Sequence, residues 1–216
     1  MSEKNIVISL KMVICGDIGV GKTCLYSRIN NLEYNPSPQT TSNDYKRKTY
    51  KKGNITLNCE FWDTAGQEKY YSLNRIFFKD ARIAIIVYDI TRRETFEKIK
   101  NFWINEIQDH GKDSVVIGIA ANKSDLYANE QVNEQEARDY ANSINASFKL
   151  CSALNNEGIN ELVEELTDKY LEINKIIYTK DNNDFKISDD SKIKKKKMLL
   201  IYNNLYFNFY ILEKAI

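Results

Sequence analysis

The feature that most constrains this chain is a glycine-rich stretch at residues 16–23, which reads Gly-Asp-Ile-Gly-Val-Gly-Lys-Thr and completes the pattern G-x-x-x-x-G-K-[ST]. It follows an apolar run at residues 6–15 with the composition of a buried parallel strand. Glycines let the backbone turn tightly and aim several N–H groups at one anion, which the positive end of the following helix also faces. Lys22 is then placed to reach the β- and γ-phosphates, and the Thr23 hydroxyl to bind Mg²⁺. The pattern predicts a nucleoside triphosphate site with these contact residues: Gly16, Asp17, Ile18, Gly19, Val20, Gly21, Lys22, Thr23 and Cys24.

The composition favours one domain without a nucleic acid partner. The chain has 216 residues, enough for one α/β domain with a sizeable core and a tail. Its 31 basic and 30 acidic residues leave a net charge of +1, so no overall positive electrostatic field attracts a nucleic acid polymer.

His110 lies in a polar stretch and is predicted on a surface loop. The cysteines lack metal-binding spacing and are interpreted as buried, reduced side chains of a cytoplasmic protein: Cys15, Cys24, Cys59 and Cys151.

Apolar runs alternate with helical patterns along the chain, which is typical of a doubly wound α/β domain with a mostly parallel sheet. A polar turn at residues 52–54 predicts a hairpin, so we expect one antiparallel edge strand. The pattern predicts six strands, at residues 6–15, 44–51, 55–62, 82–89, 114–120 and 147–151. It predicts five helices, at residues 22–31, 68–79, 94–108, 133–144 and 158–173.

The composition changes after about residue 174, which divides the chain into a domain at residues 1–175 and a tail at residues 176–216. Residues 180–192 are polar and rich in Asp and Asn, as in a flexible linker. A lysine cluster, at positions 192 and 194–197, precedes an apolar run. That run is shorter than the roughly 20 residues that a spanning helix needs and is broken by asparagines, so a membrane span is not expected.

A second motif, Asp63-Thr64-Ala65-Gly66-Gln67-Glu68, follows the predicted strand at residues 55–62. Asp63 is therefore expected at the carboxyl end of that strand, where its carboxylate can hold Mg²⁺ through water. The Gly66 N–H can reach the γ-phosphate. Gln67 carries a donor and an acceptor, so it can orient an attacking water without becoming charged. The alternative interpretation is a solvent loop with incidental acidic residues.

A third motif, Asn122-Lys123-Ser124-Asp125, follows another predicted strand. The Asp125 carboxylate can accept two hydrogen bonds from guanine, at N1–H and the exocyclic amine. Adenine lacks this donor pair and would leave an acceptor unpaired. Asn122 and Lys123 are expected to brace the loop and cover the base, with Tyr34 against its other edge. Alone this motif is weak, but three motifs in the right order support one another, and a P-loop kinase or ATPase would leave it unexplained.

These motifs, with Cys151-Ser152-Ala153 near the end, resemble those of Ras-like small GTPases over residues 6 to about 173. The Rab branch is the most similar, through Asp44-Tyr45, Glu60-Phe61-Trp62 and the stretches at residues 69–73, 77–81 and 86–91. The resemblance implies a P-loop GTPase fold and a switch that cycles between GTP and GDP with Mg²⁺ in vesicle-mediated membrane traffic. It places such a protein in the cytoplasm, at the cytosolic face of endomembranes.

The resemblance also implies roles for individual residues. Hydrolysis of GTP would be slow without an activating protein and would depend on Gln67 and Lys22. Backbone N–H groups near Ser152 and Ala153 would meet the guanine oxygen. We expect a monomer whose switch regions bind an exchange factor, a GTPase-activating protein and effectors. The metal ligands would be Thr23, Thr40 and Asp63.

The chain departs from the family pattern at four places. The switch threonine is Thr40 when counted back from the second strand and Thr41 when counted forward from the phosphate loop; we favour Thr40. Ile18 is bulky where most relatives keep a small residue, so we expect it to crowd Gln67 and slow hydrolysis. This favours an alternative function, a GTP-binding interaction module with negligible hydrolysis. Leu154 replaces a common lysine, and guanine specificity should survive that change.

The fourth departure is a carboxyl terminus without a cysteine, so anchoring by prenylation is not expected for the chain as written. One hypothesis is that the lysine cluster and the apolar run adsorb to an anionic membrane surface, giving a peripheral association. The alternatives are a disordered extension or a mispredicted final exon.

Overall fold

The computed structural model describes residues 5–35, 45–64, 77–111 and 114–176. These residues contain a six-stranded sheet in the order β2-β3-β1-β4-β5-β6. All neighbouring strands are parallel except β2 and β3, which are antiparallel. The strands are β1 (Ile6–Gly16), β2 (Tyr45–Lys52), β3 (Ile55–Asp63), β4 (Ile83–Asp89), β5 (Val116–Asn122) and β6 (Ser147–Leu150). The predicted mostly parallel sheet with one antiparallel edge strand is confirmed.

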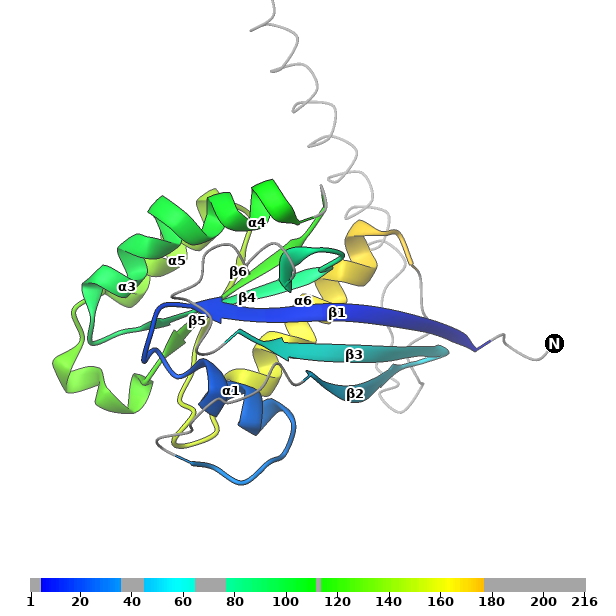
Figure 1. Ribbon diagram of the computed structural model, residues 1–216, viewed down its shortest axis with the longest axis horizontal. Coiled ribbons are helices and arrows are strands. Elements are labelled where there is room, and N and C mark those ends of the chain that lie inside the picture. The colour runs from blue at the N-terminus through cyan, green and yellow to red at the C-terminus, as the bar shows by residue number, and fades with distance from the viewer. Residues whose placement is uncertain (1–4, 36–44, 65–76, 112–113, 177–216) are drawn as a thin grey trace, which may run out of the picture. The chain divides into compact units, whose positions relative to one another are not determined.

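Helices cover both faces of the sheet (Figure 1). The α-helices among the described residues are α1 (Lys22–Ile29), α3 (Arg93–Lys98), α4 (Ile104–His110), α5 (Glu134–Ser143) and α6 (Ile159–Ile173). Two apolar clusters, one on each face, form the core. Helices α1 and α6 pack on Leu10, Met12 and Ile14, whereas α3, α4 and α5 pack on the face that carries Val13 and Cys15. Side chains of β1 alternate between the two clusters because successive residues of a strand point to opposite faces.

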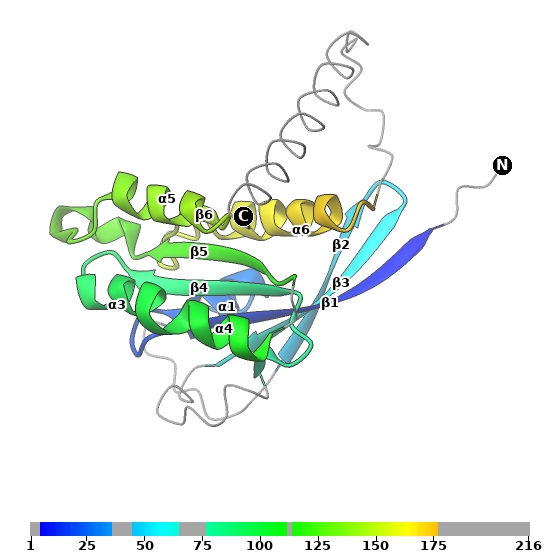
Figure 2. The same cartoon turned by 90° about the horizontal axis from the view of Figure 1, so that it is seen from above.

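The antiparallel edge strand results from a tight turn. Gly53 has φ +54°, which a residue with a side chain rarely adopts, and Lys52 pairs directly with Ile55 across the turn. Figure 2 shows this hairpin of β2 and β3 at the edge of the sheet opposite β6. Two lysines of β2 reach the neighbouring helices: Lys48 donates to the Ile29 carbonyl at 2.7 Å, and Lys52 pairs with Asp168 of α6.

Three predictions need correction. The helix predicted at residues 94–108 is interrupted by a π-helical segment, Ile99–Trp103, between α3 and α4. His110, predicted on a loop, is the last residue of α4. The strand predicted at residues 114–120 begins later and ends later, because its ladder with β4 continues to the pair Asp89 and Asn122. Asn122 is therefore part of β5.

Other predictions agree with the structure or lie outside it. All four cysteines are buried and unpaired, as expected, and burial raises the pKa of the Cys15 thiol to about 12. Most of the predicted helix at residues 68–79 lies outside the described residues, as does the tail from residue 177. Within the described ranges, no helix is both long enough and apolar enough to span a bilayer.

Candidate nucleotide-binding site

The glycine-rich loop connects β1 to α1 at the carboxyl end of the sheet. Gly16 has φ +141°, and a Cβ there would come within 3.0 Å of the Val87 carbonyl oxygen. Gly21 has φ +96°, and a Cβ there would collide with the amide nitrogen of Asn122. Both positions therefore need glycine for reasons of conformation and of space. Helix α1 begins immediately afterwards at Lys22, so the positive end of its dipole faces the same loop.

Lys22 and Thr23, at the start of α1, lie where the motif predicts. Lys22 is 3 % exposed, and its ammonium donates to the Asp17 carbonyl at 2.8 Å, which holds the side chain across the loop. The Thr23 hydroxyl donates to a carboxylate oxygen of Asp63 at 2.6 Å. Asp63 is the last residue of β3 and is 5 % exposed. The structure thus brings together two of the predicted metal ligands, and a hydroxyl with a carboxylate is a donor set that Mg²⁺ accepts.

Asn122 joins two loops through its side-chain amide. Its nitrogen donates to the Val20 carbonyl at 2.8 Å, and its oxygen accepts from the Ala153 N–H at 3.2 Å. The residue is 1 % exposed. Its place as the last residue of β5 aims the amide between the phosphate loop and the loop after β6. The Ala153 N–H, which was predicted to meet the base, is engaged by this contact.

Asp125 lies just after Asn122 and is oriented by Ser152. The Ser152 hydroxyl donates to one Asp125 carboxylate oxygen at 2.5 Å and accepts from the Asn155 N–H at 3.0 Å. Ser152 is fully buried, and the Ser124 N–H donates to the Cys151 carbonyl at 3.0 Å. The two predicted base-contacting loops are therefore fastened to each other, with one carboxylate rotamer selected by the serine.

Arg28 of α1 also contacts the base loops, which the sequence did not indicate. Its guanidinium donates to the Ala153 carbonyl at 2.7 Å and to the Leu154 carbonyl at 2.8 Å. It also lies 4.6 Å from the centroid of the Tyr34 ring. Burial raises the pKa of the Tyr34 hydroxyl, with contributions from nearby Cys24 and Asp125. Tyr34 therefore lies beside the predicted base site, and the Leu154 side chain points outward, 53 % exposed.

Asp89 is a further residue of this site that sequence reasoning missed. It ends β4 beside Asn122 and accepts from the Lys123 ammonium at 2.6 Å. The Thr91 N–H and hydroxyl donate to its other oxygen at 2.9 and 2.7 Å. Burial would raise the pKa of the Asp89 carboxyl, but the hydrogen bonds from Lys123 and Thr91 outweigh it and lower this pKa. An acidic residue at the carboxyl end of a strand adjacent to the Asn-Lys-Ser-Asp strand was the available signal.

Four predicted site residues lie outside the described residues: Thr40, Thr41, Gly66 and Gln67. The choice between the two threonines and the roles of Gly66 and Gln67 stay predictions. Ile18 is described and is 48 % exposed at the outer turn of the phosphate loop. Its predicted effect on Gln67 also stays a prediction.

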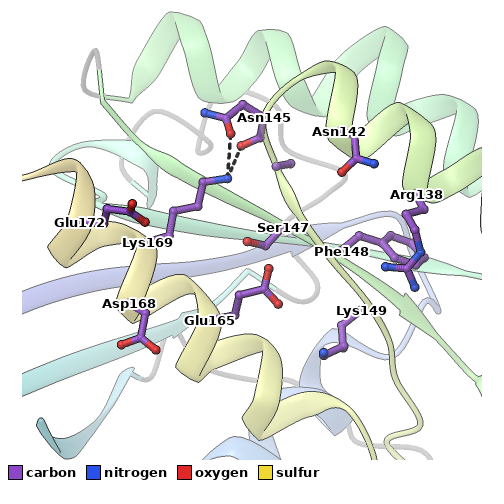
Figure 3. A pocket seen from close by; sticks show the side chains of 11 residues that line it. Arg138, Asn142, Asn145, Ser147, Phe148, Lys149, Glu165, Asp168, Lys169 and Glu172 are labelled. Atoms are coloured by element: carbon purple, nitrogen blue, oxygen red, sulfur yellow. Dashed lines mark hydrogen bonds between the residues drawn. The ribbon is translucent and has the colours of Figure 1, made fainter. Parts of the chain in front are cut away.

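A cavity of about 490 Å³ lies away from these loops, along β6 between α5 and α6 (Figure 3). Its lining is polar and includes Glu165 and Glu172 of α6 and Arg138 of α5. Lys169 crosses it to bond the backbone and side-chain oxygens of Asn145, at 2.6 and 3.1 Å. The cavity shares no lining residue with the described part of the nucleotide site.

Comparison with known proteins supports the site. Residues 11–172 match the model of the Ras family. The chain is 41 % identical over 159 residues to the Ras-related protein Rab-22A of Mus musculus, covering 73 % of this chain and 81 % of the relative. It is 37 % identical over 163 residues to the putative ras-related protein Rab-5B of Dictyostelium discoideum, covering 75 % of each. It is 36 % identical over 173 residues to the Ras-related protein Rab-21 of Geodia cydonium, covering 80 % of this chain and 75 % of the relative.

Proposed function

Because the chain belongs to the Ras family, as a Rab-type small GTPase that hydrolyses GTP and acts in membrane traffic, we propose that it cycles between GTP and GDP at the site described above. The observation that carries this proposal is the double contact of Asn122 with Val20 and Ala153, which joins the phosphate loop to the loop after β6. The alternative function, a binding module with negligible hydrolysis, is not favoured by membership of a family of GTP hydrolases.

Each part of the site has a distinct task in this proposal. The amides of residues 16–21 and the N-terminus of α1 bind the phosphates, and the buried Lys22 ammonium neutralises β- and γ-phosphate charge. Thr23, Asp63 and Thr40 would hold Mg²⁺, and the ion would supply positive charge against the phosphates. Gln67 orients the attacking water, and the γ-phosphate orders the loops that carry Thr40 and Gly66.

Guanine selectivity rests on Asp125 in this proposal. Its carboxylate accepts from N1–H and the exocyclic amine of the base, while Ser152 holds its orientation through the 2.5 Å hydrogen bond. Lys123 covers the base and is itself held by Asp89. Adenine offers no matching donor pair, so an ATP complex would leave the carboxylate unpaired.

Exchange factors, GTPase-activating proteins and effectors would bind near the switch regions, with Tyr45 and Trp62 as described contact residues. Their rings are stacked, with centroids 4.8 Å apart, and the Lys11 ammonium lies 4.7 Å from the Trp62 ring centroid. Tyr45 is 47 % exposed. Phe61, next to Trp62 in β3, is fully buried in the core beneath this surface. We expect the protein to be monomeric between these encounters.

The experiment for the cycle is a nucleotide exchange and hydrolysis assay. Protein loaded with a fluorescent GDP should release it when challenged with excess GDP or GTP and retain it when challenged with excess ATP. Removal of Mg²⁺ with EDTA should speed the release. Without the cation, the negative charge of the Asp63 carboxylate repels the phosphates. Loaded GTP should be converted to GDP in a single turnover. Equal displacement by ATP, or GTP that persists indefinitely, would contradict the proposal.

For location, we propose the cytosolic face of endomembranes, with the lysine cluster at positions 192 and 194–197 attracting anionic lipid. Each lysine near such a surface contributes about 1 kcal/mol at low salt. The full chain should therefore co-sediment with phosphatidylserine vesicles, and replacing the lysines at 194–197 by glutamine should release it. Neutral phosphatidylcholine vesicles are the control. Binding that is equal with both lipids and insensitive to salt would exclude an electrostatic association.

A further inference from the structure

Two cations, one at each end of α3, contact the phosphate loop from outside the predicted nucleotide site. Arg92, which precedes α3, donates through a guanidinium nitrogen to the Ile18 carbonyl at 2.7 Å. Lys98, the last residue of α3, bonds a carboxylate oxygen of Asp17 at 2.7 Å. The two contacts fall on adjacent residues of the loop, so α3 holds its outer turn at two points.

Asp17 places a negative charge in a loop that is built to bind phosphate. Its side chain is only 16 % exposed. Burial would raise the pKa of this carboxyl, but the hydrogen bonds from Lys98 and from the Ile18 N–H and the charge of Lys98 lower it. The carboxylate is therefore ionised at neutral pH, and without Lys98 it would repel a polyanion nearby.

Arg92 extends the contact to the base loop. Its Nε donates to an Asp89 carboxylate oxygen at 3.3 Å, and the same oxygen lies 2.6 Å from the Lys123 ammonium. A continuous path of polar contacts thus leads from the Ile18 carbonyl through Arg92 and Asp89 to Lys123. The guanidinium is suited to this position because its fixed fork can bond two acceptors at once, which an ammonium does less well.

We propose that Arg92 and Lys98 are positioning residues of the nucleotide site: Lys98 cancels the charge of Asp17, and Arg92 turns the Ile18 carbonyl away from the phosphates and ties the phosphate loop to the base loop. This proposal rests on the proposed nucleotide site. A peptide unit whose carbonyl is held outward presents its N–H group inward, which is the orientation that a phosphate-binding loop needs. Neither residue touches the nucleotide in this account.

Arg93 provides a matched control on the same helix. It is adjacent to Arg92, but its guanidinium pairs with Glu136 of α5 at 2.6 Å. Replacing Arg93 by alanine removes an arginine and an ion pair of α3 without removing a contact to the phosphate loop. A general loss of stability in α3 should therefore affect this variant as much as Arg92→Ala.

The test measures release of fluorescent GDP and of a nonhydrolysable GTP analogue from the full chain with Mg²⁺. Arg92→Ala should release both about tenfold faster than wild type, since a hydrogen bond from a charged donor is lost, and Arg93→Ala should match wild type. Lys98→Ala should release GDP about three- to fivefold faster, given the strength of a half-exposed ion pair. The GTP analogue should be affected more, because it carries more negative charge.

The second arm is a charge cycle. Adding Asp17→Asn to Lys98→Ala removes the uncompensated carboxylate and should restore release towards the wild-type rate, whereas a folding defect would persist. Release unchanged in both single variants, or a double variant as fast as Lys98→Ala with a lowered melting temperature, would overturn the proposal. If either of these results is found while the wild type retains GDP, the proposed function is still supported. A wild type that fails to retain guanine nucleotide overturns the proposed function itself.

Discussion

Asp125→Ala is expected to abolish the preference for guanosine over adenosine nucleotides. The carboxylate would accept two hydrogen bonds from guanine, and each such bond to a charged group contributes about 1.5–3 kcal/mol. Their loss should weaken GDP binding by roughly two to four orders of magnitude while affecting ADP little. Equilibrium competition between the two nucleotides for the same fluorescent probe measures this directly.

Two further variants serve as comparisons for Asp125→Ala, one close to the carboxylate and one remote from it. Ser152→Ala keeps the carboxylate but removes the hydroxyl that orients it at 2.5 Å, so it should cause a smaller loss, about tenfold. Asp168→Ala removes an exposed carboxylate of α6 that pairs with Lys52, remote from the base loops, and should leave selectivity intact. A variant at position 125 that still discriminates against adenine would show that base recognition resides elsewhere.

Gly158→Ala is expected to have the largest effect on stability. Gly158 precedes α6 with φ +72°, and a Cβ there would come within 3.0 Å of the Leu150 carbonyl oxygen. Left-handed backbone costs a residue with a side chain about 1–2 kcal/mol, and a clash with rigid backbone adds to that strain. The total loss in free energy of unfolding should exceed about 3 kcal/mol, measured by urea denaturation of nucleotide-free protein.

Gly19→Ala separates strain from collision. Gly19 has nearly the same backbone, φ +73°, but the nearest atom to an added Cβ is an Arg92 nitrogen at 3.7 Å. This variant should lose only the strain energy, about 1–2 kcal/mol. Equal losses in the two variants would show that the backbone near Leu150 can move to accommodate the added Cβ without a further loss in free energy of unfolding. Because Ser152 and Glu157 form a bridge just before Gly158, the unstable variant should also release GDP faster.

The parts of the site that could be predicted from the sequence are those encoded locally. The phosphate loop is a contiguous stretch whose glycines are required by its own backbone, and Asp63 and Asp125 follow strands that can be recognised from their composition. Parallel strands place their carboxyl ends at one edge, which explains why separate motifs meet in space. The alternation of apolar runs with helical patterns indicated a mostly parallel sheet, whereas the strand order β2-β3-β1-β4-β5-β6 was not predicted.

The parts that could not be predicted depend on side chains that act across the fold. Arg28 bonds the Ala153 carbonyl from 125 positions away, and no local pattern marks an arginine in a helix as a contact to a distant loop. Arg92 and Lys98 look like ordinary charges of an exposed helix until α3 is placed beside the phosphate loop. The π-helical segment at Ile99–Trp103 was missed because both of its terminal residues are buried and apolar, as a regular helix would also require.

The side chain of Asn122 donates one hydrogen bond and accepts another, and its two partners belong to loops that would bind opposite ends of the proposed ligand. An aspartate of equal size would face the Val20 carbonyl with an oxygen, so attraction would become repulsion. The requirement at this position is thus chemical rather than volumetric. Because one amide bonds both loops, a change that displaces either loop should also disturb the other.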